Sequence, residues 1–90
     1  MPAPIVTSDG STIRRYDVVE EIGPVAVVAS VGSTMTVLGG DGCKFISRAH
    51  CLHALKEEVR ALGGNGIIHV EHTRERGSGI AVNVCPPPGE

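Results

Sequence analysis

Aromatic side chains are almost absent from this sequence, which has one Tyr, one Phe and no Trp among its 90 residues. Aromatic residues usually supply much of the apolar surface that a small domain buries. A chain of this length buries only about 60–65% of its unfolded surface. The core must therefore be built from Val, Ile, Leu and Ala. We expect a single domain, residues 1–90, that gains stability from a disulfide, a metal or a partner subunit.

The sequence also lacks a positive net charge, a long apolar run and a signal peptide, and each absence disfavours one class of protein. The net charge of −2 does not suit a protein that binds nucleic acid through a cationic face. No apolar run reaches the roughly 18 residues that span a bilayer, so we predict no membrane partner. The first residues lack the basic and apolar segments of a signal peptide, and we therefore expect a cytoplasmic protein.

The cysteines are few and odd in number: Cys43, Cys51 and Cys85. An odd count in a reducing compartment disfavours a disulfide framework. We interpret them as free thiols, which leaves a metal or a partner subunit as the source of extra stability.

The first part of the chain alternates extended segments with turn signals. After a loose lead-in at residues 1–4 and a short extended piece at 5–7, residues 11–22 predict a long, partly exposed strand. A bulge is expected near Val18-Val19. The pair Gly23-Pro24 then separates this strand from the next.

Residues 25–29 form a continuously apolar, β-branched run. This pattern is typical of a strand that is buried on both faces. One helix cannot cover both faces, so we predict that Val25, Val27 and Val28 contact a neighbouring subunit. The Gly-rich segment that follows, residues 30–44, predicts at most a short strand at 34–38.

The clearest helical signal is a set of apolar residues spaced 3, 4 and 3 apart: Leu52, Leu55, Val59 and Leu62. This spacing marks one face of a helix. Ser47 is the expected N-cap, and Gly63 is the expected left-handed residue after the last turn.

Two alternating runs follow the helix, at residues 67–73 and 80–85. Because a polar, Gly-containing tip joins them, they predict a β-hairpin. The Pro-rich tail at residues 86–90 ends the sheet. The order strand, strand, helix, strand, strand predicts an α+β fold, in which one main helix packs on a small, mostly antiparallel sheet.

Several of these segments resemble the YbjQ-like heavy-metal-binding domain family. The likeness runs through Thr12–Val28, through Ala54–Val70 with its Ala61-Leu62-Gly63 helix ending, and through Ile80–Cys85. It covers roughly residues 5–85. The resemblance implies an α+β protomer of a ring-shaped homo-oligomer, a pentamer. It carries no catalytic residues over to this chain.

The sharpest chemical pattern is His50-Cys51-Leu52-His53. Imidazoles at i and i+3 of a helix can reach one metal ion, and a nearby thiolate suits Zn, Cu or Ni. Helical angles place both histidines opposite the apolar face and Cys51 at its edge. The alternative is a pair of solvated histidines beside a half-buried cysteine.

A second metal hypothesis involves His69 and Cys85. If residue 72 pairs with residue 80 in the hairpin, His69 lies near Asn83 and Cys85 is its diagonal neighbour on the same face. In a ring, one such histidine per subunit would create a multi-imidazole site on the axis. The alternative is a sheet face of mixed polar residues.

The last hypothesis is enzymatic. Cys43, His50 and Asp41 have the residue types of a nucleophile, a base and an orienting acid. A domain this small offers little concavity for a substrate, so we expect a structural or binding module rather than an enzyme. A small Cys-dependent hydrolase or redox enzyme is the alternative.

Overall fold

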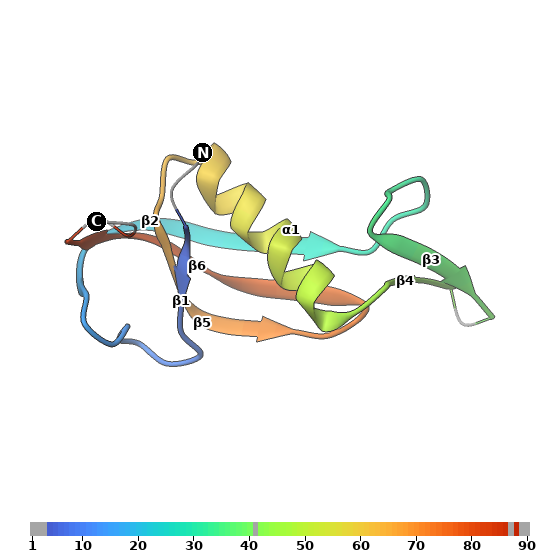
Figure 1. Ribbon diagram of the computed structural model, residues 1–90, viewed down its shortest axis with the longest axis horizontal. Coiled ribbons are helices and arrows are strands. Elements are labelled where there is room, and N and C mark those ends of the chain that lie inside the picture. The colour runs from blue at the N-terminus through green and yellow to red at the C-terminus, as the bar shows by residue number, and fades with distance from the viewer. Residues whose placement is uncertain (1–3, 41, 87, 89–90) are drawn as a thin grey trace.

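The computed structural model describes residues 4–40, 42–86 and 88 (Figure 1). Most of the predicted lead-in and of the Pro-rich tail lies outside these residues. A four-stranded sheet has the order β1-β5-β6-β2, and a separate two-stranded sheet pairs β3 with β4. The elements are β1 (Val6–Thr7), β2 (Asp17–Val28), β3 (Thr36–Gly39), β4 (Gly42–Phe45), α1 (Arg48–Ala61), β5 (Gly66–His72) and β6 (Arg76–Cys85).

The α+β class and the single helix on one face of a sheet confirm the sequence-based expectation (Figure 1). The predicted strand order is only partly right. Strand β1 runs parallel to β5, which makes the four-stranded sheet mixed. The segment that follows β2 forms the β3–β4 hairpin instead of a single short strand.

The predicted break at Gly23-Pro24 is wrong, because β2 continues through both residues. Strand β2 is an edge strand of the sheet, and an edge position tolerates a proline that cannot donate a hydrogen bond. Gly23 has a φ of 151° beside a register shift, which its lack of a Cβ permits. The bulge expected near Val18 is confirmed by a second shift between Val18 and Glu20.

The start of the predicted long strand also differs. Residues 13–16 form a tight turn in which the Tyr16 amide donates to the Ile13 carbonyl at 3.1 Å. Arg15 has a φ of 72° there, so β2 begins only at Asp17.

Helix α1 begins and ends as its sequence predicts. The Ser47 side chain accepts a hydrogen bond from the His50 amide at 3.3 Å, and Gly63 has a φ of 83° just beyond the helix. The buried face, however, consists of Cys51, Leu55 and Val59. Leu62, expected on this face, is 51% exposed. Compared with the predicted apolar face, the buried face of α1 is therefore rotated about the helix axis, away from Leu62 and toward Cys51.

Strand β6 explains this rotation, since it presents only small residues to the helix. A Cβ at Gly77 would lie 2.7 Å from Cys51 Sγ, and one at Gly79 would lie 2.6 Å from Ile67 Cγ2. Ala81 is the next residue on that face and is completely buried. The helix can approach the backbone of β6 closely, and Cys51 fills the space above Gly77.

The apolar run at residues 25–29, which was predicted to be a strand buried on both faces, buries only some of its side chains. Val25 is 8% exposed and packs in the core with Leu55 and Val59, and Val27 packs against the same cluster. Val28 is 68% exposed. Burial of Val25 within its own chain disagrees with its predicted subunit contact, and the contact stays a prediction for the partly buried Val27 and the exposed Val28.

The opposite face of the sheet is covered at one end only. Ile13, from the turn before β2, packs with Ile68, Val82 and Val84 in a second buried cluster. Farther along the same face, a shallow and mainly apolar hollow is lined by residues of β2, β5 and β6, among them Pro24, Ala26 and Ile80.

Residues 30–46, here called the arm, contain the β3–β4 hairpin and project from the end of the sheet (Figure 1). Hydrogen bonds hold its base to the β5–β6 turn. The Ala29 amide donates to the Glu75 carbonyl at 2.9 Å, and Arg74 Nε donates to the Phe45 carbonyl at 3.0 Å. Phe45 is buried at this base, but Leu38 near the tip is 73% exposed.

Candidate functional site

Cys51 does not point toward the two histidines that flank it in sequence. Its side chain is completely buried under the turn between β5 and β6. Burial raises the pKa of the Cys51 thiol above its ordinary value, and a hydrogen bond with the backbone of Thr73 opposes this only in part. A thiol that stays protonated is neither a nucleophile nor a metal ligand. The structure therefore separates Cys51 from the predicted histidine site.

His50 and His53 do lie together, on a part of α1 that also meets the arm. Both line one shallow hollow, together with Met35 and Ala49. His50 Nδ1 lies 2.7 Å from Ser47 Oγ, so the capping residue also orients this ring. Of the two histidines, His50 is partly buried and His53 is exposed.

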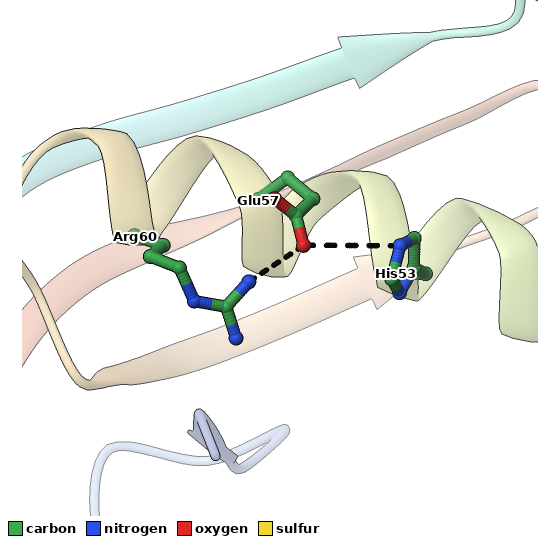
Figure 2. A network of polar contacts seen from close by, with 3 residues as sticks. All are labelled: His53, Glu57 and Arg60. Carbon is green, nitrogen blue, oxygen red and sulfur yellow. Dashed lines mark hydrogen bonds and ion pairs between the residues drawn. The ribbon is translucent and has the colours of Figure 1, made fainter. Parts of the chain in front are cut away.

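The outer side of α1 carries a short chain of polar contacts (Figure 2). His53 Nε2 lies 3.8 Å from Glu57 Oε1, and the same oxygen accepts a hydrogen bond from Arg60. Glu57 and Arg60 are three residues apart, a spacing at which opposite charges on a helix can pair. Since these groups are largely exposed, we assign the pair little stabilising effect.

The predicted pairing of His69 with Cys85 is wrong. Ile68 pairs with Ile80 and His72 with Gly77, and a register shift lies between these pairs. His69 falls in this irregular stretch with a φ of 54°. Cys85 lies at the other end of β6, about 17 Å beyond Ile80 at ~3.4 Å per residue. The two side chains therefore cannot share a metal ion within one chain.

The proposed nucleophile Cys43 lies on β4, opposite Leu38 and next to the tip of the arm. Its suggested base, His50, lies on α1 beyond the base of the arm and contacts Ser47. Asp41 lies outside the described residues. Over residues 4–40, 42–86 and 88, no three His, Cys, Asp or Glu side chains gather as a potential metal site.

Several large apolar side chains are exposed on and beside the arm. In the described part of the chain, eight large hydrophobic residues are exposed, and five of them lie on the arm or on the adjoining end of β2. We call this set the apolar arm surface: Val28, Val31, Val37, Leu38 and Ile46. Sequence reasoning found only Val28. The others lie in the Gly-rich segment, where Val37-Leu38 next to Gly39-Gly40 was the available signal for a hairpin.

No protein-family model, curated protein or solved structure matches this chain. Its resemblance to the YbjQ-like family therefore stays a prediction. Among the described residues, no helix has both the length and the apolar character needed to cross a bilayer.

One member of the apolar arm surface, Val28, lies on an edge strand of the sheet. Strand β2 pairs with β6 on one side and is the last strand of the sheet on the other. The backbone groups on an edge can pair with a strand from another chain. Exposed apolar side chains beside such an edge are typical of a surface that associates with a protein partner.

Proposed function

We propose that this protein is a structural or binding module that forms a homo-oligomer through its arm. The observation that carries the proposal is the exposure of the apolar arm surface, where Val31 is 77% and Leu38 is 73% exposed. Large apolar side chains exposed together on one projecting element usually mark an interaction site.

The energetics of the hairpin support the same conclusion. An isolated two-stranded hairpin is marginally stable in water, and β3–β4 pairs only four residues with four. Burial of a Val or Leu side chain contributes about 1.5–3 kcal/mol. A partner that covers Val31, Val37 and Leu38 would therefore stabilise the arm by several kcal/mol.

We propose a second copy of this chain as that partner. The arm of one subunit would lie on the mainly apolar hollow near Pro24, Ala26 and Ile80 of the next. Because the two surfaces differ, the contact is head-to-tail, and such a contact forms a ring when the rotation between neighbouring subunits closes. The ring form and the pentameric number rest on the resemblance to the YbjQ-like family.

We propose a non-catalytic role in place of the Cys-dependent hydrolase or redox enzyme. Cys51 is buried with a raised pKa. Cys43 lies near the tip of the arm, on a different element from His50. Nucleophilic catalysis by a thiol needs an activating base, and Cys43 is separated from the base proposed for it, His50.

Sedimentation equilibrium tests the oligomer directly. We expect the wild-type protein to have several times the 9.3 kDa mass of one chain, and Leu38→Asp to shift it to the monomer. The matched control is Leu62→Asp, because Leu62 is also exposed but lies beyond the end of α1. A wild-type protein that is monomeric at micromolar concentration contradicts the proposal, and so does equal dissociation by both variants.

A further inference from the structure

We propose that Met35, His50 and His53 form a Cu(I) site where the arm meets α1. This inference goes beyond the proposed oligomer and does not depend on it. It rests on the shared hollow that these three residues line with Ala49. The sequence pattern suggested Cys51 as the sulfur ligand, but the fold buries Cys51 and places Met35, which carries a thioether, at the hollow that His50 and His53 line.

Backbone contacts hold Met35 in this position. The Ile46 amide, just before the helix, donates to the Met35 carbonyl at 2.8 Å. The Met35 amide in turn donates to Ser33 Oγ at 3.1 Å. Met35 also lines a neighbouring hollow with Ala54 and Glu57 of α1. Met35 therefore lines two hollows that it shares with residues of α1.

The His50 ring is oriented as metal-binding histidines usually are. Its Nδ1 lies 2.7 Å from Ser47 Oγ. When Nδ1 donates its proton to this hydroxyl oxygen, the lone pair is on Nε2, which is then the nitrogen that can bind a metal. A hydrogen-bonding group on the ring nitrogen that does not bind the metal, here Ser47 Oγ, fixes the tautomer and the orientation of a histidine ligand.

His53 supplies the second imidazole from the next turn of the same helix. Its Nε2 is 3.8 Å from Glu57 Oε1, which is longer than a hydrogen bond. The Glu57 carboxylate already accepts a hydrogen bond from Arg60 (Figure 2). The exposed His53 ring can therefore turn toward the hollow without breaking a hydrogen bond to Glu57.

The donor set decides which ion fits. A thioether is a soft ligand that selects Cu(I), and imidazole is compatible with it. Hard cations such as Mg²⁺ and Ca²⁺ require oxygen ligands. Thioether and imidazole ligands are uncharged, so they would not neutralise the positive charge of Cu(I). The hollow is open, so solvent can reach this charge. Binding would also connect the arm to α1.

The test is an anaerobic Cu(I) titration in competition with a chromophoric Cu(I) chelator. Cys43 and Cys85 are accessible thiols that bind Cu(I) themselves, so the parent protein carries Cys43→Ser and Cys85→Ser. We expect one equivalent of Cu(I) to bind, and at least a tenfold loss of affinity in Met35→Leu and in His50→Ala. His72→Ala is the control, since His72 lies on β5. The proposal is overturned if Met35→Leu leaves the Cu(I) affinity unchanged. It is also overturned if His72→Ala lowers that affinity as much as Met35→Leu does.

A second measurement decides the case if a variant fails to fold. Ag(I) imitates Cu(I) without redox chemistry, and the sequence contains only two methionines, Met1 and Met35. We expect one equivalent of Ag(I) to shift the Met35 methyl signal in an NMR spectrum of the parent protein. An unshifted Met35 methyl signal overturns the site. Sedimentation of the same sample reports the oligomer separately, so the two proposals can fail independently.

Discussion

The helix–sheet body and the arm use the same kinds of side chain in opposite ways. In the body, Leu55, Val59 and Ile67 are completely buried between α1 and the sheet. In the arm, Val31 and Leu38 are more than 70% exposed. The shortage of aromatic residues therefore does not weaken the core evenly. The body buries its central apolar residues, although Val19 and Leu62 stay exposed, and the arm exposes Val31, Val37, Leu38 and Ile46.

The comparison is sharpest for two leucines. We expect Leu55→Ala to lower the free energy of unfolding by about 2–5 kcal/mol, because it leaves a cavity in a fully packed site. Leu38→Ala removes the same atoms from an exposed site, and we expect a change within about 0.5 kcal/mol. Urea unfolding at a dilution where the chain is monomeric measures both. Similar losses in the two variants would show that the arm is packed within its own chain.

A pair of glycines tests the close approach of helix and sheet. We expect Gly77→Ala to cost about 1–3 kcal/mol, because the added methyl overlaps a packed neighbour; that neighbour is Cys51 Sγ, 2.7 Å away. Gly40 in the arm has no atom within 4 Å of an added Cβ, so Gly40→Ala is the control with a change within about 0.5 kcal/mol. A neutral Gly77→Ala would contradict the described packing. Urea unfolding of both variants beside the wild type gives the comparison.

The smallest effect concerns pH and Cys51. Burial raises the pKa of this thiol in the folded state. The stability that it contributes is thus complete below the ordinary thiol pKa of about 8.5. It is lost as the pH rises toward the folded value, because only the unfolded state ionises.

We therefore expect the wild type to lose stability relative to Cys51→Ala between neutral and alkaline pH. Urea unfolding of both proteins across this range measures the difference. If the difference in the free energy of unfolding between the two proteins stays constant over this pH range, the raised pKa of the Cys51 thiol is contradicted.

Local signals in the sequence were sufficient for the elements whose geometry is local. Ser47 and Gly63 defined α1, and the residues around Val18 defined a bulge. The errors arose where the outcome depended on a neighbouring element. Pro24 continues a strand only because that strand is at the sheet edge. Cys51 is buried only because residue 77 on β6 has no side chain.

The candidate site shows the same limit. The spacing of His50 and His53 was visible, but Met35 reaches them through the arm, whose path the Gly-rich sequence did not define. His72 pairs with Gly77 and not with Ile80, and one more shift lies between Ile68 and Glu71, so His69 is displaced from the predicted position near Asn83. An irregularity of one residue in a strand changes every later pairing.

The small residues of β6 also have an entropic consequence. Gly77, Gly79 and Ala81 have no side-chain rotamers to lose, so ordering this strand against α1 restricts no χ angle on the sheet side. The cost lies in the backbone, because a glycine in the unfolded chain samples more conformations than any other residue. Where the helix and the sheet meet, folding therefore costs little side-chain entropy on β6 and more backbone entropy.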